Sequence, residues 1–205
     1  MPEESRTDRS SRRGFLATVG VATAGVTVLT AGQSVGWLSG TNLFAPRVPR
    51  DGPSGLAINR TARAAAVEQL AGDPGWRLAV AGARTVALSR SDLLALPQTA
   101  VTLPIACVEG WSTSAHWVGV RVRDLLAVVG AAPGASVRCT SLEPDGVYRT
   151  SEMGPEFAQH PTTLVALRLN GETLSLDHGF PARLIAPDRP GVLQTKWLTA
   201  VEALP

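Results

Sequence analysis

The most informative segment of the sequence is Ile105-Ala106-Cys107-Val108-Glu109-Gly110-Trp111-Ser112, which continues at Trp117-Val118-Gly119-Val120. A cysteine ends an apolar run, and a glycine and polar groups follow within a few residues. A thiol at the junction of a strand and a loop suits a metal or a nucleophilic reaction, because the thiolate is both a ligand and a nucleophile. The position equally suits an inert cysteine, because free Cys is among the most buried residue types.

The length and composition indicate a globular protein with an added segment. A chain of 205 residues allows one domain of ordinary size and something more. Its 44% hydrophobic and 18% charged content are values typical of globular proteins. The net charge of +2 is too small to indicate a nucleic-acid partner. The 20 glycines and 15 prolines favour short elements joined by turns.

The N-terminal region has the features of an export or anchor segment. Residues 1–14 are polar, are expected to be disordered, and contain the pair Arg12-Arg13. The uncharged run 15–38 would span about 36 Å as a helix, which exceeds a bilayer core of about 30 Å. Arg-Arg-Gly-Phe-Leu is similar to a twin-arginine export signal. We favour a retained transmembrane anchor, because Thr30-Ala31-Gly32 is only a loose cleavage site; a cleaved signal and a buried soluble helix are the alternatives.

A linker at 39–54, with Pro46, Pro49 and Pro53, separates this segment from the folded domain. That domain is expected at 55–205, which is long enough for one hydrophobic core.

The pattern within the domain predicts an α+β fold that is mostly β, with mixed sheets and short helices. Apolar periodicity predicts helices at 61–70, at 91–96 with Ser89 or Ser91 as the N-cap, and at 120–129. Alternation predicts strands at 76–81, 85–88, 99–107, 136–142, 183–186 and 194–201. Asn170-Gly171 predicts a hairpin that joins 163–169 to 173–176.

Two ordered blocks of sequence resemble the sulfite-oxidase-type molybdopterin oxidoreductases. The first is the opening stretch, with Cys107-Val-Glu-Gly-Trp-Ser and Trp117-Val-Gly-Val. The second is Asp177-His-Gly-Phe-Pro-Ala-Arg-Leu184, followed by Gly191 and Thr195-Lys-Trp-Leu198. Ile58-Asn-Arg-Thr61 is similar to the family's opening segment. The resemblance covers about residues 55–205 and implies the molybdopterin-domain fold of that family.

The resemblance also implies a cofactor, Mo-molybdopterin, and the residues that hold it. Cys107 matches the single thiolate ligand of the metal, which is a soft donor that must first lose its proton. Arg183 matches the residue that binds the pterin phosphate, with His178 as a companion donor and Lys196 beside them. Further residues that the resemblance places at the cofactor are Asn59, Arg60, Ser112, Thr113, Asp145, Gln194 and Thr195.

Glu109 and Tyr148 complete the set as catalytic candidates. The resemblance places Glu109 in the loop beside the metal, together with Ser112 and Thr113. It places Tyr148, with Asp145, in a segment that approaches the cofactor pocket.

Each candidate also has a purely structural interpretation. His178 can cap a turn, and Glu109 can cap a helix that begins near Ser112. Arg183, Arg189 and Lys196 can form a solvated face. The three tryptophans of the two blocks and the single tyrosine can serve packing alone; these residues are Trp111, Trp117, Trp197 and Tyr148.

The chain departs from the sulfite oxidases after the cysteine. Where those enzymes carry arginines that hold the anionic substrate, this chain has Trp111 and Ser112. A sulfite dianion would lose the partners that offset its desolvation. The motif instead resembles the bacterial exported branch, which includes the periplasmic protein-methionine-sulfoxide reductase catalytic subunit. This resemblance implies oxygen-atom transfer on a sulfoxide or another small molecule, outside the cytoplasm, with a haem-bearing electron-transfer partner.

Three alternatives remain open. The first is a cofactor-free binding or assembly module on the same fold, and the second is a sulfite dehydrogenase. The third is a disulfide between Cys107 and Cys139 in an oxidising compartment. Because Cys139 lies in a strand pattern, we expect it to be a buried core residue.

Overall fold

The computed structural model describes residues 14, 17–21, 23, 53–106 and 112–205, and the chain divides into compact units at 1–47 and 48–205. In the first unit the described residues are helical, and the Thr18 and Thr23 hydroxyls donate to the Gly14 and Val19 carbonyls. No helix within the described residues is long and apolar enough to cross a membrane. The predicted Arg12-Arg13 motif, most of the predicted span 15–38 and its cleavage site lie outside those residues.

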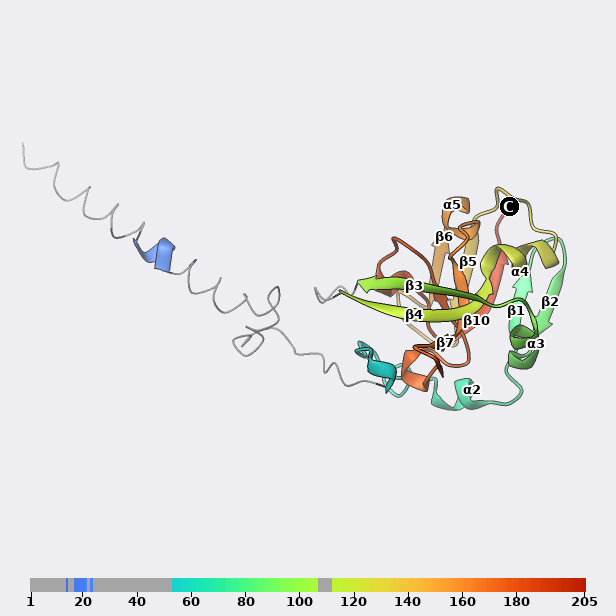
Figure 1. Ribbon diagram of the computed structural model, residues 1–205, viewed down its shortest axis with the longest axis horizontal. Coiled ribbons are helices and arrows are strands. Elements are labelled where there is room, and N and C mark those ends of the chain that lie inside the picture. The colour runs from blue at the N-terminus through green and yellow to red at the C-terminus, as the bar shows by residue number, and fades with distance from the viewer. Residues whose placement is uncertain (1–13, 15–16, 22, 24–52, 107–111) are drawn as a thin grey trace, which may run out of the picture. The chain divides into compact units, whose positions relative to one another are not determined.

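The second unit is built on two five-stranded sheets in the described part of the chain (Figure 1). The first sheet has the order β2-β1-β10-β5-β6, and its strands are β1 (Leu78–Ala81), β2 (Thr85–Leu88), β5 (Val137–Ser141), β6 (Thr150–Met153) and β10 (Leu198–Ala203). β1 runs parallel to β10, whereas the other neighbouring strands of this sheet pair in antiparallel fashion.

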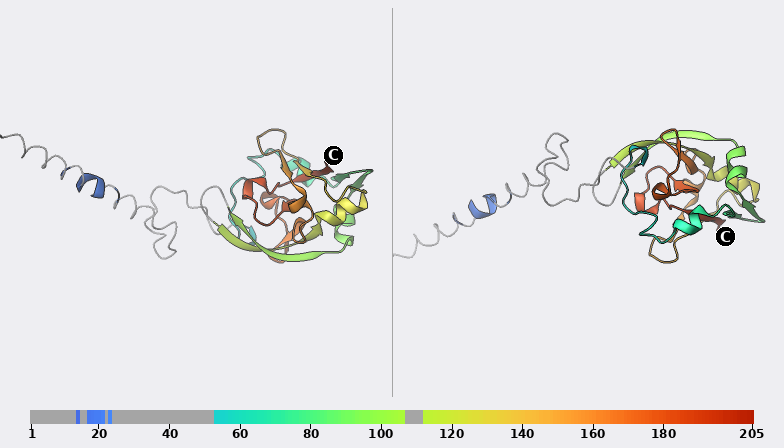
Figure 2. Two further views of the ribbon diagram at one scale, coloured as in Figure 1. Left: turned by 90° about the horizontal axis from the view of Figure 1, so that it is seen from above. Right: turned by 90° about the horizontal axis from the view of Figure 1, so that it is seen from below.

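The second sheet is entirely antiparallel in the described pairings. It has the order β3-β4-β7-β8, with β9 also paired to β7. Its strands are β3 (Thr99–Ala106), β4 (Ser112–Arg121), β7 (Leu164–Leu169), β8 (Glu172–Thr173) and β9 (Arg183–Ile185). The β3–β4 hairpin is long and curves along one side of the domain (Figure 2). Pro104 is tolerated in β3 because an edge strand has N–H groups that need no partner strand.

The helices are short, as the sequence predicts. They are α2 (Glu68–Gly72), α3 (Arg90–Ala95), α4 (Val122–Val128) and α5 (Pro155–Ala158), with 3₁₀ turns η3 (Pro53–Gly55), η4 (Leu176–His178) and η5 (Gly191–Leu193). Ser89, not Ser91, caps α3: its hydroxyl accepts from the Asp92 N–H, and the Asp92 carboxylate accepts from the Ser89 N–H at 2.8 Å.

The core is formed by both sheets and the helices. The larger cluster joins strands of both sheets with one face of α4, where Val122, Leu125 and Leu126 are buried. A second cluster lies on the second sheet and contains Trp117. Cys139 is a free, fully buried cysteine in β5, which confirms its predicted place in the core. Burial raises the pKa of its thiol to about 12.

Several predicted elements are confirmed, and the α+β class with mostly β structure is among them. β2 has the predicted bounds, and the Asn170-Gly171 hairpin forms with positive φ at both residues, 49° and 88°. Gly119 lies at a register shift between β4 and β7. A Cβ there would collide with the Val165 carbonyl oxygen and lie 2.6 Å from the Ala166 Cα, so the position requires glycine.

Other element predictions are wrong. The helix predicted at 61–70 begins only at Glu68, because residues 62–66 form turns and the Ala62 N–H is bound by the Asp177 carboxylate. The helix predicted at 120–129 starts at Val122, since the preceding residues extend β4. From Ser112 to Arg121 the described chain is strand and not helix, so Ser112 and Thr113 lie in β4 and not in a loop. β10 starts at Leu198, not at residue 194, and β6 and α5 were not predicted.

Candidate functional site

Arg183, the first residue of β9, is a buried cation that has no acidic partner among the described residues. Its side chain is 4% exposed. Nη1 donates to the His178 carbonyl at 3.0 Å and Nη2 to the Gln194 carbonyl at 3.4 Å, while Nε has no acceptor among the described residues. The ion pairs of the described residues do not include Arg183. Burial lowers the pKa of its guanidinium to about 10.

His178 ends η4 and is fixed in one tautomer. Its Nε2 lies 3.1 Å from the Leu56 carbonyl oxygen, which only accepts, so Nε2 carries the proton. Nδ1 then accepts from the Ser175 hydroxyl at 3.0 Å. Burial, followed by the charges of Arg183 and Lys196, lowers the pKa of His178 to about 4, and the ring is neutral at pH 7. Both ring nitrogens are therefore engaged within the protein.

Gly179 allows Arg183 and Lys196 to lie close to the same point of the backbone. Its φ is 105°, in the left-handed region, where it ends η4. A Cβ at this position would lie 3.0 Å from the Arg183 Cβ and 3.2 Å from the Lys196 Cβ. A side chain at residue 179 would therefore push β9 and the segment at Lys196 apart.

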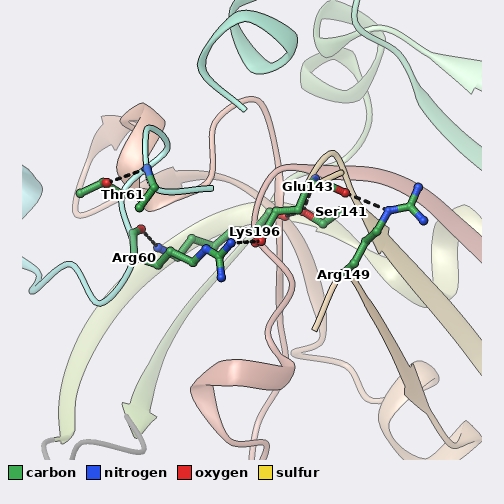
Figure 3. Close-up of polar contacts among 7 residues, drawn as sticks. Arg60, Thr61, Ser141, Glu143, Arg149 and Lys196 are labelled. Atoms are coloured by element: carbon green, nitrogen blue, oxygen red, sulfur yellow. Dashed lines mark hydrogen bonds and ion pairs between the residues drawn. The ribbon is translucent and has the colours of Figure 1, made fainter. Parts of the chain in front are cut away.

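Lys196 joins three segments of the chain. Its ammonium donates to the Arg60 carbonyl at 2.7 Å and to the Asp177 carbonyl at 2.9 Å. Burial, followed by the Arg183 charge, lowers the pKa of Lys196 to about 7. Figure 3 shows the continuation of this network: Arg60 forms an ion pair with Glu143 at 2.8 Å, and the Ser141 hydroxyl donates to the Lys196 carbonyl.

These residues line two hollows that share Asn59, Gly191 and Lys196. The first holds about 30 Å³ and is bounded also by His178 and Arg183. The second holds about 110 Å³, and its walls include Arg60, Glu143, Tyr148, Gln194 and Thr195. The fold thus brings together eight residues that the sequence analysis selected, from opposite ends of the domain: Asn59, Arg60, Tyr148, His178, Arg183, Gln194, Thr195 and Lys196.

Gln194 and Thr195 are buried and are held by their neighbours. The Gln194 amide donates to the Arg189 carbonyl at 3.0 Å, and its Oε1 has no partner among the described residues. The Thr195 hydroxyl lies 2.8 Å from that of Ser151. The alternative of a solvated basic face is wrong, because Arg183 and Arg189 are both buried.

Tyr148 and the remaining predicted site residues lie in β4, before β6 or outside the described residues. Cys107 and Glu109 lie outside the described residues; Cys107 directly follows the last residue of β3. Thr113 pairs with Ile105, which lines the first hollow. Asp145 is exposed and lines neither hollow, and Tyr148 is 53% exposed in a turn before β6.

Sequence reasoning missed the roles of Asp177 and Glu143. Asp177 binds the Ala62 N–H at 2.8 Å and so fixes the segment that carries Asn59 and Arg60. Its position next to His178 in the quoted block was the available signal. Glu143 gave no such signal, because its partner Arg60 is distant in the sequence.

With this geometry in place, comparison with known proteins identifies the family. Residues 64–205 match the family model described as the oxidoreductase molybdopterin binding domain. The chain belongs to this family. The match covers most of the chain and includes Cys107, Arg183 and Lys196. The family resemblance stated from the sequence is thereby confirmed, together with molybdopterin as the cofactor of the family.

Curated relatives match over parts of their length. The chain is 34% identical to the putative protein-methionine-sulfoxide reductase subunit YedZ1 of Azospira oryzae, over 54% of this chain and 41% of that protein. It is 31% identical to human mitochondrial sulfite oxidase (63% and 29% covered). It is 27% identical to the protein-methionine-sulfoxide reductase catalytic subunit MsrP of Campylobacter jejuni (62% and 48% covered). The chain therefore spans less than half the length of each of these relatives.

A solved structure supports the fold. The crystal structure of the sulfane dehydrogenase SoxCD from Paracoccus pantotrophus matches with a TM-score of 0.57 at 23% identity, over 63% of this chain and 38% of that chain. At this identity the likeness concerns the fold alone, and it agrees with the mixed sheets and short helices described above.

Proposed function

We propose that this chain is a molybdenum-molybdopterin oxidoreductase that catalyses oxygen-atom transfer on the outer side of the membrane. The observation that carries the proposal is the buried Arg183 guanidinium, which has an unused Nε donor and no acidic partner among the described residues. An isolated buried charge is costly, so a site that keeps one is suited to an anion such as the phosphate of a pterin cofactor.

The chain's own residues have separable roles in this proposal. Arg183 and the neighbouring Lys196 hold the anionic end of the cofactor, while the hydrogen bonds of His178 keep Arg183 and the Leu56 segment in place. Asn59, Arg60, Gln194 and Thr195 line the adjoining walls, and Ser112, Thr113 and Asp145 are further candidates for contact with the cofactor. Cys107 supplies a thiolate to the metal, and Glu109 and Tyr148 are the candidates for proton handling or substrate contact. When bound, the cofactor supplies two-electron redox chemistry at molybdenum.

We infer a sulfoxide or another small neutral molecule as the substrate. The names of two relatives, YedZ1 and MsrP, contain protein-methionine-sulfoxide reductase, which supports this class. Trp111 and Ser112 stand where a sulfite site needs cations. A sulfite dehydrogenase is the second candidate, and the similarity to human sulfite oxidase favours it.

The location and partner follow from the N-terminal sequence and the redox chemistry. Arg12-Arg13 and the uncharged run 15–38 support export with a retained membrane anchor, or release after cleavage. We further propose that a haem-bearing partner supplies or accepts electrons, because a two-electron reaction at molybdenum needs an electron donor or acceptor.

Metal and pterin analysis tests the central proposal. The full chain is produced in a host that makes the cofactor, and the molybdenum content per chain is compared in the natural protein, Cys107→Ser and Cys139→Ala. We expect molybdenum in the natural protein and in Cys139→Ala, and its loss in Cys107→Ser, because only Cys107 is the proposed ligand. Titration of the denatured, unreduced, metal-free chain should find two free thiols.

Three results would count against the proposal. Equal molybdenum in all three proteins would remove Cys107 as the ligand. A natural protein that carries neither metal nor pterin would favour the cofactor-free binding module. A single disulfide in place of two thiols would favour the Cys107–Cys139 bond.

A further inference from the structure

Trp117 lies against the buried arginine of the site. It sits in the middle of β4 and is fully buried, with Val101 opposite it on β3 and Leu169 opposite it on β7. The Arg183 Cζ lies 5.1 Å from the centroid of its ring. This distance is within the range of an attractive cation–π interaction, which strengthens when both partners are removed from water.

The sheet leaves room for this contact. Ala166 of β7 pairs with Gly119 on one side and with Arg183 on the other. Ala166 also belongs to the same apolar cluster as Trp117. The small Ala166 side chain, which lies between Arg183 and β4, is therefore compatible with the approach of the long Arg183 side chain to the indole.

In a site that binds an anion, the chemical nature of the side chain that contacts the Arg183 guanidinium matters. A carboxylate beside Arg183 would neutralise the guanidinium and occupy the same N–H donors that a phosphate needs. An aromatic face attracts the cation but accepts no N–H in the guanidinium plane, and here the Nε donor has no protein acceptor among the described residues. Lys196, a half-buried basic residue of the same site, similarly has its Nζ 4.9 Å from the Trp197 ring centroid.

We propose that Trp117 is a positioning residue, which holds the Arg183 guanidinium through its ring face and keeps the Nε donor available to the anionic end of the cofactor. This inference rests on the proposed function. The indole N–H itself has no partner among the described residues, so phenylalanine, which keeps an aromatic face and lacks this donor, is the conservative replacement.

The test measures how fast bound pterin leaves the cofactor-loaded full chain. Trp117→Leu should release pterin about tenfold faster than the natural protein, and Trp117→Phe should fall between the two. Trp76→Leu is the matched control, because Trp76 is another buried tryptophan of the core and has no cation–π contact with Arg183 among the described residues. In an Arg183→Gln background, Trp117→Leu should cause no further acceleration, since its effect passes through Arg183.

A second measurement does not depend on the leucine variant folding. Fluorine atoms placed stepwise on the indole at residue 117 weaken the ring's attraction for a cation and leave its shape almost unchanged. The release rate should rise with each fluorine, which a purely packing role would not produce.

The outcomes separate the two claims. A natural protein without pterin would overturn the proposed function and this inference together. Pterin in the natural protein, with release rates that ignore fluorination, would overturn the inference alone. Equal effects of Trp117→Leu and Trp76→Leu, or an undiminished effect in the Arg183→Gln background, would also overturn it.

Discussion

At the scale of single residues, His178 and Arg183 show how the site divides its work. Both nitrogens of the His178 ring form hydrogen bonds within the protein, to Leu56 and Ser175. The Nε donor of Arg183, in contrast, has no acceptor among the described residues. The resemblance selects both residues, but no sequence pattern predicts that the ring would be neutral. That property follows from the Leu56 carbonyl and the burial, and both depend on the tertiary fold.

The lowered pKa of His178 predicts a specific loss of stability in acid. Between pH 6.5 and about 4 the unfolded chain takes up a proton on this imidazole and the folded chain does not, so the free energy of unfolding falls as pH decreases through this window. His178→Gln removes this contribution. The urea midpoints of both proteins are measured at several pH values. The difference in midpoint between the natural protein and His178→Gln should shrink below pH 6.5. Parallel curves would contradict the assignment.

At the scale of secondary-structure elements, the sequence predicts best where periodicity and local turn chemistry agree. β2 and the Asn170-Gly171 hairpin are of this kind. The predicted helix at 61–70 fails because its alanine-rich pattern competes with a distant hydrogen bond, from the Ala62 N–H to Asp177. β4 was missed although exposed Ser114 and His116 alternate with buried neighbours, because the adjoining motif favoured a loop.

The register shift in β4 yields a prediction at this scale. Gly119→Ala should lower the free energy of unfolding by about 2 kcal/mol or more, because its Cβ would collide with the β7 backbone at Val165. Gly134→Ala is the control, since a Cβ there meets nothing within 4 Å. Chemical denaturation of both variants measures the difference. A Gly119→Ala protein as stable as the control would show that β7 can move away.

At the scale of the whole molecule, the site is built from residues that adjoin strands of both sheets. Binding of the cofactor and the free energy of unfolding of the domain are therefore coupled. A ligand that binds only the folded chain raises the free energy of unfolding. The cofactor-loaded chain should therefore unfold at a higher urea concentration than the cofactor-free chain. Arg183→Gln should shrink this difference, whereas Arg121→Gln, at a surface ion pair with Asp124, should preserve it. An unchanged difference in Arg183→Gln would separate Arg183 from cofactor binding.

The site as a whole was predictable only in part. The resemblance gathers Arg183, His178 and Lys196 from one block, and the fold confirms that they line one hollow. The wall that Glu143 and Tyr148 add comes from a turn before β6, a strand with no clear sequence pattern. Such long-range pairings depend on sheet order, which periodicity does not encode.

The place of β10 bears on the order of events during synthesis. This strand follows β1 by more than a hundred residues, yet it lies in the centre of the first sheet, between β1 and β5. The early β1–β2 hairpin therefore waits for residues up to Ala203 before it gains its inner neighbour. Non-local pairing of this kind folds slowly and leaves an unpaired strand edge in the meantime. A growing chain thus exposes that edge until β10 has been made, and the walls at Lys196 cannot assemble earlier.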